Sequence, residues 1–210
     1  MITLDKHTGI NLKKGSSIRL EKEGRKLERI CVGLNWGAIP RKGLMRTLMG
    51  NSVAVDLDGA VSTYAAGQLY ETVYFNHLMS EDRAIGHSGD DLTGDLDGDD
   101  GLDNEVITIN LKRVSRDIDT IFIYLNSYEG QDFGDIPYSK LRIYEGSPDR
   151  VDDTLATFNL SVEQKFKGYV SMIMGKLVRS EDSWAFHTIG EPVNPQKIPA
   201  IAQHIKQVYL

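Results

Sequence analysis

The sequence predicts an all-β fold, a two-sheet antiparallel β-sandwich with a short C-terminal helix. Short runs rich in Val, Ile, Tyr and Phe alternate with polar residues and are separated by turn residues, which is typical of sandwiches. The segment Asp119 to Asn126 is apolar on both faces and therefore indicates a central strand. Only near the C-terminus does the hydrophobic period change to that of a helix.

Strand-like alternation recurs along most of the chain. The expected strands are residues 17–22, 28–36, 53–64, 69–76, 106–111, 119–127, 139–145, 154–159, 169–178 and 183–189. The last two form a hairpin, and the second of them carries Trp184 and Phe186 on one face.

The C-terminal helix is expected at about residues 199–209. Pro199 can occupy its first turn, where a missing N–H costs nothing, and Ile201, Ile205 and Val208 fall on one face. Because this stripe is short and apolar, we expect the helix to cap the sandwich.

Composition limits the classes of protein to consider. The 210 residues include 40% hydrophobic ones and no Pro/Ser-rich linker, so we expect a single domain over residues 1–210. The single cysteine, Cys31, excludes a disulfide framework and indicates a buried thiol. Without an apolar leader or a long apolar run, the expected location is cytoplasmic. A net charge of −6 argues against duplex nucleic acid as a partner.

Residues 86–105 form an acidic loop with seven aspartates, one glutamate and no Lys or Arg. Two carboxylates about 5 Å apart repel each other by roughly 3 kcal/mol at an effective dielectric constant of about 20. The loop is therefore either extended in water, as a solvated acidic turn, or folded around a cation. Its five glycines allow the backbone turns that would bring carboxylates and carbonyls together. Oxygen ligands without Cys or several His are those that Ca²⁺ prefers.

The acidic loop is not an EF-hand. If the twelve-residue motif began at Asp95, Asp100 would stand where glycine is needed and Val106 where the bidentate glutamate is needed. The alternating run 106–111 that follows predicts a strand and not a helix.

Asp56 and Asp58 lie two residues apart on the expected strand 53–64, so their side chains point to the same face. That strand is largely apolar, and a buried carboxylate pair needs a cation or a hydrogen-bonding partner. Together with the acidic loop the pair provides more carboxylates than one ion requires. The sequence therefore predicts two neighbouring Ca²⁺ ions.

These residues resemble the TerD-type tellurium-resistance and stress-response proteins. The resemblance rests on Gly89-Asp90-Asp91-Leu92-Thr93-Gly94, Asp97-Gly98-Asp99-Asp100, Glu105, Asp56-Leu57-Asp58 and Val32-Gly33-Leu34-Asn35-Trp36. It covers about residues 10–190 and implies a Ca²⁺-binding β-sandwich with no established enzymatic activity. The sequence departs from the family pattern at Asp91 in place of the common Asn, at the inserted residues 101–104 and in the segment 37–52.

The expected metal ligands come from both acidic segments. They are Asp56 and Asp58, then Asp90, Asp97, Asp99 and Glu105, next Asp91, Asp95 and Asp100, with the backbone carbonyls of Leu92, Gly94 and Leu96. Asp103 belongs to the insertion, and we expect it to be solvated and without a ligand role.

Residues 37–52 form a basic, methionine-containing segment between two expected strands. Leu44, Met45, Leu48 and Met49 have helical spacing, which predicts a short helix packed on the core. The alternative is a docking surface, since methionine-rich surfaces adapt to partners.

The predicted function is that of a non-enzymatic Ca²⁺-binding structural or interaction module in a stress response, with protein partners that the sequence does not identify. The sequence has no Gly-x-Ser-x-Gly elbow, no phosphate-binding loop with its lysine and no zinc-ligand spacing. Two alternatives stay open. One is a hydrolase in which two metals activate water, and the other is a membrane-surface adaptor that Ca²⁺ links to anionic lipid.

Overall fold

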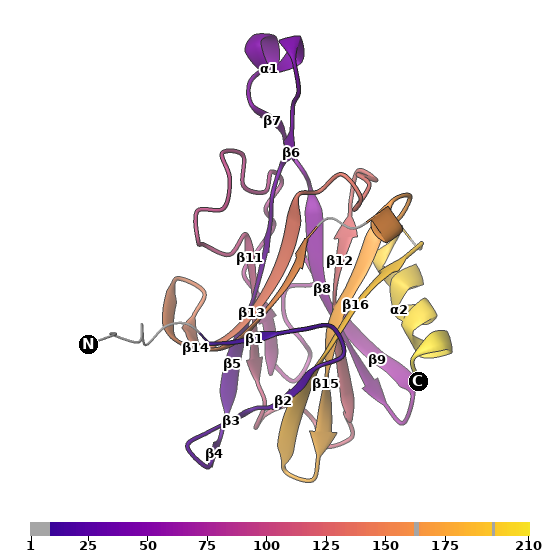
Figure 1. The fold of residues 1–210 in the computed structure, drawn as a ribbon. Coiled ribbons are helices and arrows are strands. Elements are labelled where there is room, and N and C mark those ends of the chain that lie inside the picture. Colours follow the sequence, from indigo (N-terminus) through magenta and orange to yellow (C-terminus); the bar gives the residue numbers. More distant parts are fainter. Residues whose placement is uncertain (1–8, 162–163, 195) are drawn as a thin grey trace, which may run out of the picture.

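The structure is a computed structural model that describes residues 9–161, 164–194 and 196–210. Two large sheets face each other and form a β-sandwich, with one helix along the outside of the second sheet (Figure 1). The predicted fold class is confirmed.

The elements follow one another mainly as short and medium-length strands. In chain order they are β1 (Ile10–Leu12), β2 (Ser17–Arg19), β3 (Glu21–Lys22), β4 (Arg25–Lys26), β5 (Arg29–Trp36), β6 (Ile39–Pro40), α1 (Leu44–Met49), β7 (Ser52–Val53), β8 (Leu57–Ala65), β9 (Gln68–Val73), β10 (Ile85–His87), β11 (Glu105–Asn110), β12 (Thr120–Ser127), β13 (Tyr138–Ser147), β14 (Arg150–Ser161), the 3₁₀ turn η1 (Gln164–Phe166), β15 (Ser171–Ser180), β16 (Ser183–Val193) and α2 (Ile198–Val208).

The strands of each sheet are mostly antiparallel. The first sheet has the order β1-β14-β13-β5-β11-β10, and the second has the order β2-β16-β15-β12-β8-β9. The exception is β1, which runs parallel to β14 with Ile10 opposite Ala156. A wholly antiparallel sandwich was expected, and this three-residue edge strand departs from that expectation.

The position of β12 in the middle of the second sheet explains why its sequence is apolar on both faces. It pairs with β15 on one side and with β8 on the other. Ile121 and Ile123 contribute to the core between the sheets, whereas Phe122 and Tyr124 belong to a second apolar cluster on the outer face.

Helix α2 covers that outer cluster. Ile201 and Ile205 are buried in it, and the Tyr64 hydroxyl donates a hydrogen bond of 2.8 Å to the Ala202 carbonyl. The predicted capping role is confirmed, but Val208 is exposed and Ile198 takes its place on the buried face. Among the described residues, no helix is both long enough and apolar enough to cross a membrane.

The segment 53–64 differs from the single strand that the sequence predicted. Strand β8 begins only at Leu57, and Val53 belongs instead to β7, where it pairs with Ile39 of β6. Strands β6 and β7 pair with each other and with neither large sheet, so they carry α1 beyond the end of the sandwich (Figure 1). We call residues 37–53 the arm.

Helix α1 forms where helical spacing predicted it, but it does not pack on the core. Leu44 and Leu48 are 74% and 70% exposed, and Met49 is exposed as well. The prediction of a core-packed helix is wrong because the β6–β7 pair is a separate two-stranded ladder that leads away from the sheets. Glycines with positive φ stand at both ends of the helix, Gly43 at 59° and Gly50 at 89°, and they allow the chain to reverse there.

Candidate metal centre

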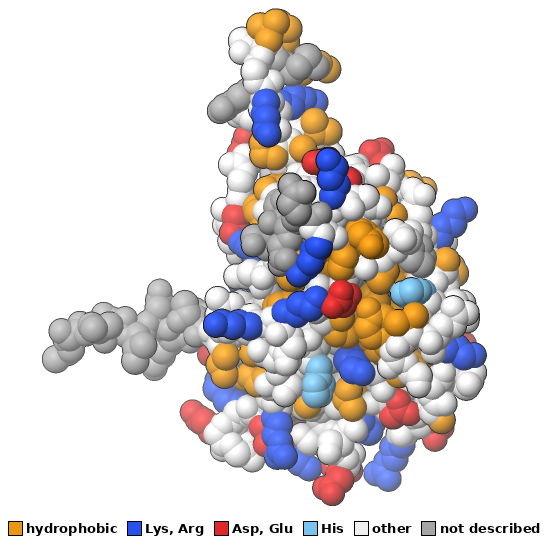
Figure 2. Space-filling model, turned by 45° about the vertical axis from the view of Figure 1, so that its right-hand side comes forward, with side chains coloured by type: hydrophobic (Ala, Val, Ile, Leu, Met, Phe, Trp, Pro, Cys, Tyr) orange, Lys and Arg blue, Asp and Glu red, His pale blue; other side chains and the backbone are white. Residues whose placement is uncertain are grey.

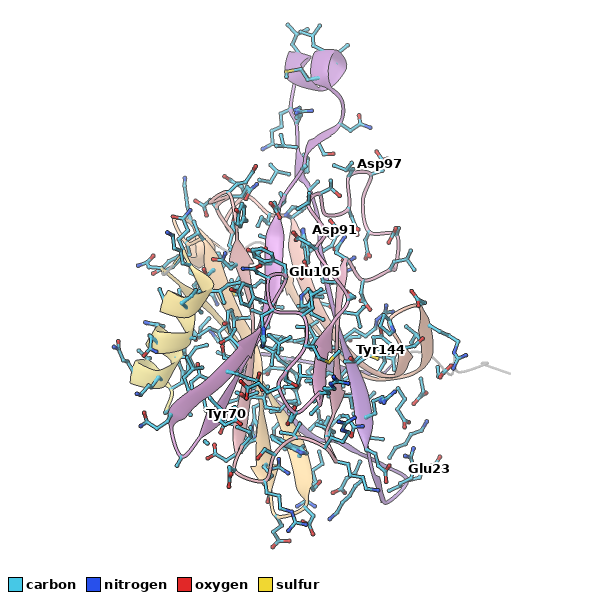
Figure 3. The ribbon with its side chains drawn as sticks, turned by 180° about the vertical axis from the view of Figure 1, so that it is seen from behind. Glu23, Tyr70, Asp91, Asp97, Glu105 and Tyr144 are labelled. Atoms are coloured by element: carbon cyan, nitrogen blue, oxygen red, sulfur yellow. The ribbon has the colours of Figure 1, made fainter. Side chains whose placement is uncertain are left out.

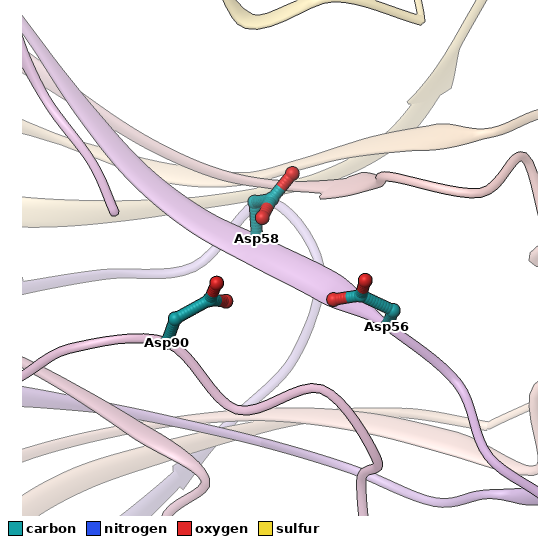
Figure 4. Close-up of side chains that lie close together, drawn as sticks. All are labelled: Asp56, Asp58 and Asp90. Carbon is teal, nitrogen blue, oxygen red and sulfur yellow. The ribbon is translucent and has the colours of Figure 1, made fainter. Parts of the chain in front are cut away.

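Three aspartates converge where the second sheet meets the acidic loop. Asp56 and Asp58 lie just before and within the start of β8, and Asp90 lies three residues after the end of β10. One carboxylate oxygen of each lies within 4.8 Å of those of the other two. Figure 4 shows the three side chains pointing toward a common space, Asp90 from the loop and the aspartate pair from β8.

The chain brings these residues together for local reasons. Asp56 and Asp58 alternate with Leu57, whose side chain is buried in the core between the sheets, so both carboxylates point away from that core. Asp90 follows β10, whose His87 pairs with Ile107 of the first sheet. The trio therefore joins side chains carried by the two opposed sheets.

The trio has few hydrogen-bond donors for its negative charge. Asp58 is almost fully buried, and in the part of the chain that the structure describes only the Asn126 amide donates to its side chain, at 3.2 Å from Oδ2. The Oδ1 atom of Asp56 is buried and has no hydrogen-bond partner among the described residues. A buried carboxylate oxygen without a donor costs free energy that a bound cation would recover.

Electrostatics within the trio favour protonation in the absence of a cation. Burial, followed by repulsion from Asp90, raises the pKa of Asp56 to about 6. Burial also raises the pKa of Asp58 to about 7, opposed by the Asn126 hydrogen bond and reinforced by the charges of Asp56 and Glu105. Both carboxyl groups thus lie in a site whose unmet requirement is positive charge.

Asn126 holds Asp58 in place through a buried chain of hydrogen bonds. Its amide nitrogen donates to Asp58, and its amide oxygen accepts a 3.0 Å hydrogen bond from the Ser171 hydroxyl. Asn126 lies directly opposite Asp58 on the neighbouring strand, and Ser171 lies opposite Asn126 on the next. Sheet register therefore sets the orientation of this ligand candidate.

Glu105, labelled below Asp91 in Figure 3, is fully buried and has protein partners for both oxygens. Its Oε2 atom accepts a 2.7 Å hydrogen bond from the Gly59 N–H and lies 3.2 Å from His87 Nε2, and its Oε1 atom accepts from the Asp91 N–H at 3.3 Å. Burial raises its pKa, and the His87 interaction opposes that rise. Glu105 ties β8 to the acidic loop through these contacts, and its role as a ligand stays a prediction.

Two more predicted ligands shape the backbone of the loop. Asp91 Oδ1 accepts hydrogen bonds from the N–H groups of Thr93 and Gly94, at 2.9 and 2.8 Å, which closes a tight turn. Gly94 has a φ of 63°, and a Cβ there would lie 2.6 Å from the Trp36 ring. The turn thus packs on the end of β5, which explains why glycine is needed at this position.

Asp95 is the centre of a hydrogen-bond network and not part of the trio. Its two carboxylate oxygens accept from the Tyr138 hydroxyl at 2.6 Å, from the Asn35 amide at 3.0 Å and from the Asn104 amide at 3.1 Å. Its backbone carbonyl also accepts from the Ala38 N–H at 3.1 Å. Asp95 therefore fastens the loop to β13, to β5 and to the base of the arm.

The far half of the acidic loop is paired with cations of the protein. Lys140 of β13 forms an ion pair with Asp99, and Arg142 of the same strand pairs with Asp103 at 2.8 Å. Asp103 also presses against Gly33, where an added Cβ would overlap its carboxylate. The expectation that Asp103 is solvated is wrong, because the inserted residues fold back onto β5 and β13.

The remaining predicted ligands lie on the outer surface of the loop. Asp97 and Asp100 are exposed, and Asp100 accepts a 2.8 Å hydrogen bond from the Leu102 N–H. The Leu96 carbonyl accepts from the Ser52 hydroxyl at 2.6 Å, and the side chains of Leu92 and Leu96 are exposed. Asp97 lies beside the base of the arm (Figure 3), away from the three convergent aspartates.

Comparison with known proteins places this arrangement in a family. The model of the TerD domain matches residues 8–204. The chain belongs to the TerD family. A tellurium resistance protein TerZ from Serratia marcescens is 32% identical over 86% of this chain and 89% of its own length. The stress response protein SCP2 from Bacillus subtilis is 31% identical over 91% of this chain and 96% of its own length.

Solved structures agree on the TerD fold. A crystal structure of a homologue of telluride resistance protein (TerD) from Streptomyces coelicolor superimposes with a TM-score of 0.59 at 19% identity, covering 82% of this chain and 94% of that one. A second crystal structure, of a protein of unknown function, gives the same TM-score at 21% identity and 85% coverage. Identities this low support the fold and nothing finer.

Sequence reasoning missed several residues of this TerD site. Asn126 lies at the end of the central strand, and Lys140 and Arg142 alternate on β13, where the signal was two cations on one face opposite an acidic loop. The zinc-ligand test did not single out His87, yet its Nε2 atom lies 3.2 Å from Glu105 Oε2 in a buried contact. Asn126, Lys140 and Arg142 are far from the loop in sequence, so only the sheet register reveals them.

Proposed function

We propose that this TerD-family chain is a Ca²⁺-binding protein whose primary site is formed by Asp56, Asp58 and Asp90. The observation that carries the proposal is the buried, unpartnered Oδ1 atom of Asp56 between two further carboxylates. Three carboxylates and nearby carbonyls are hard oxygen donors, which suit Ca²⁺ better than the softer transition metals. Filling the site would supply the positive charge that the raised pKa values of Asp56 and Asp58 show to be lacking.

A second Ca²⁺ is proposed for the hollow of the acidic loop. Asp91, Asp97 and Asp100 line this hollow, and Asp97 and Asp100 are exposed. We assign this site a weaker affinity, because exposed carboxylates are well solvated and their charge costs little free energy without a bound ion. The primary and secondary sites would then fill in sequence as Ca²⁺ rises.

The loaded protein is proposed to act as a non-enzymatic structural or interaction module in a stress response, in the reducing cytoplasm. The names of its relatives, tellurium resistance protein and stress response protein, support the physiological setting. The cations nearest the loop, Lys140 and Arg142, are already paired with Asp99 and Asp103. This pairing supports a binding role over a hydrolase, which would use such cations on a substrate phosphate.

Calorimetric titration of chelator-treated protein tests the proposal. We expect Ca²⁺ to bind and Mg²⁺ to bind much more weakly, because Mg²⁺ demands tight octahedral geometry and dehydrates reluctantly. Asp90→Asn should remove the tighter phase, while Asp99→Asn, a matched change in the same loop, should leave it in place. Equal affinity for both ions, or an Asp90→Asn protein that binds like the wild type, would refute the primary site.

A further inference from the structure

The arm, residues 37–53, is unlike the rest of the molecule in shape and in charge. It leaves the end of the sandwich as a narrow hairpin and ends in α1 (Figure 1). It carries three basic residues, Arg41, Lys42 and Arg46, and no Asp or Glu, in a chain whose net charge is −6. A basic projection on an acidic protein indicates a negatively charged partner.

The tip of the arm is apolar and exposed. Four of the six residues of α1 are Leu or Met, and the side chains of Leu44, Leu48 and Met49 are all more than half exposed. Leu44 and Leu48 are four residues apart and share a face of the helix, whereas Met49 points about 100° away from Leu48. The three exposed apolar side chains therefore cover a sector of about 140° around the helix, an apolar face that no described part of the protein covers.

The apolar and basic groups are arranged in layers. Figure 2 shows hydrophobic side chains at the extreme end of the arm, with Lys and Arg side chains just below them, nearer the sandwich. Arg41 is held there because its guanidinium donates to the Met49 carbonyl across the arm, and its N–H donates to the Asn51 carbonyl at 2.8 Å. An anionic bilayer has the same order of layers, with acyl chains beneath charged headgroups.

The base of the arm is fixed to the acidic loop. The Ser52 hydroxyl bonds to the Leu96 carbonyl, and the Ala38 N–H bonds to the Asp95 carbonyl at 3.1 Å. The loop exposes Leu96 beside this base, so a further apolar side chain lies near the arm. The arm is thus held in a set orientation, with the apolar tip leading.

We propose that the arm inserts the apolar tip of α1 into an anionic lipid bilayer, with Arg41 and Lys42 against the headgroups. The proposal concerns the arm alone and does not rest on the metal centre. Each basic side chain near an anionic surface should strengthen partitioning by about fivefold, and this gain should fall as salt rises. Loss of two leucines from the tip should weaken partitioning by more than about tenfold.

Vesicle co-sedimentation tests the proposal with the full chain, once in Ca²⁺ and once in chelator. Vesicles of phosphatidylcholine with 30% phosphatidylglycerol, about a physiological anionic fraction, are compared with pure phosphatidylcholine. We expect the wild type to pellet with the anionic vesicles in at least one of the two conditions, and Leu44→Ser/Leu48→Ser and Arg41→Gln/Lys42→Gln to remain largely in solution. Matched controls are Tyr70→Ser, an exposed side chain at the opposite end of the molecule, and Lys112→Gln/Arg150→Gln, which removes two other exposed cations (Figure 3).

A spectroscopic variant reports insertion directly. The two native tryptophans, Trp36 and Trp184, are buried. A Leu48→Trp variant would therefore carry one exposed tryptophan, located at the tip of the arm. We expect its emission to shift to the blue with anionic vesicles and to be quenched by brominated lipid chains. Pelleting that is equal for wild type and both arm variants, or no shift at position 48, would overturn the proposal. A third outcome would also overturn it: the wild type does not bind vesicles but forms a dimer in sedimentation velocity, and Leu44→Ser/Leu48→Ser abolishes this dimer.

Discussion

The two halves of the acidic site contrast with each other, although both are built from aspartates. Asp95, Asp99 and Asp103 have donors or cations of the protein: the Tyr138 hydroxyl, Lys140 and Arg142. Asp56, Asp58 and Asp90 have almost none within the described ranges, where Asn126 alone donates a side-chain hydrogen bond to the buried pair. Carboxylate density therefore does not identify a metal site. The carboxylates that the fold leaves without compensation are the stronger candidates for one.

The sharpest way to break this comparison is to remove one carboxylate from each half. Asp58→Asn should weaken Ca²⁺ binding by about 100-fold or more, because ligand charge sets the affinity of such sites. Asp99→Asn, in the compensated half, should change it by less than about threefold, since its carboxylate is already paired with Lys140. Calorimetric titrations of the two variants side by side decide the matter, and similar losses for both would remove the distinction.

Asp95→Ala should reverse the pattern of effects. Removing this carboxylate leaves the Tyr138 hydroxyl and the Asn104 amide without this acceptor and leaves the Asn35 amide with the Leu102 carbonyl, at up to about 1–3 kcal/mol for each part-buried donor. We expect a clear loss of stability in urea unfolding, with Ca²⁺ affinity reduced much less than in Asp58→Asn. An unchanged unfolding midpoint would show that Asp95 is not the support that its contacts indicate.

Ligand stabilisation should appear only through the uncompensated half. At a Ca²⁺ concentration of about 100 times Kd, linkage adds about 2.7 kcal/mol to the free energy of unfolding. For a domain of this size the melting temperature should rise by several degrees. The rise should persist in Asp99→Asn and vanish in Asp58→Asn, as measured by thermal unfolding followed by circular dichroism. A rise that survives Asp58→Asn would locate the stabilising ion elsewhere.

The same half should give the metal-free protein an unusual dependence on pH. Folded Asp56 and Asp58 have pKa values of about 6 and 7, against 3.8 for an ordinary aspartate, so the native state keeps protons that the unfolded state has released. Stability in chelator should therefore fall as pH rises from about 4 through 7. Asp58→Asn should flatten this fall in urea titrations at pH 5 and pH 8. A wild type that gains stability across the window would contradict the assignment.

The smallest expected effect on Ca²⁺ binding is that of Asp103→Asn. Burial raises the pKa of Asp103, and the Arg142 ion pair opposes that rise, so this carboxylate is already compensated by the protein. We expect Ca²⁺ affinity to be unchanged and stability to fall by about 1–3 kcal/mol, because the partly buried Arg142 loses its counter-ion. Calorimetry and urea unfolding check both points. A strong loss of Ca²⁺ binding would mean that the inserted residues 101–104 belong to the metal site.

The sequence predicted most of the fold because period-two alternation survives in the strands that line the core. It located β12 as central and α2 as a cap, since their apolar patterns arise locally. It misjudged the arm because helical spacing in residues 44–49 shows where a helix forms and not what it contacts. The two-residue strands β6 and β7, which decide that question, are too short to leave a pattern.

The sequence predicted which acidic segments form the candidate site, but not which of their carboxylates converge and which are paired with cations of the protein. Asp56 and Asp58 could be paired from their spacing, and the acidic loop was evident. The selection of Asp90 over Asp97 or Asp99 depends on where β10 ends and on which strand carries Lys140. These are facts of long-range register, and residues far apart in sequence give no local sign of them.

The position of Glu105 has a mechanical consequence. This side chain belongs to a strand of the first sheet and accepts a hydrogen bond from the Gly59 N–H of the second, next to Asp58 in the chain, and the three convergent aspartates also come from both sheets. A cation bound there would link the two sheets at one end of the sandwich, while at the opposite end the sheets would be held together by side-chain packing. Without the ion, local separation of the two sheets would begin at the end with the aspartates. With the ion bound, it would begin at the opposite end. If this is so, added Ca²⁺ should slow amide hydrogen exchange at the first residues of β8 and β11 and leave the opposite end of the sandwich unchanged.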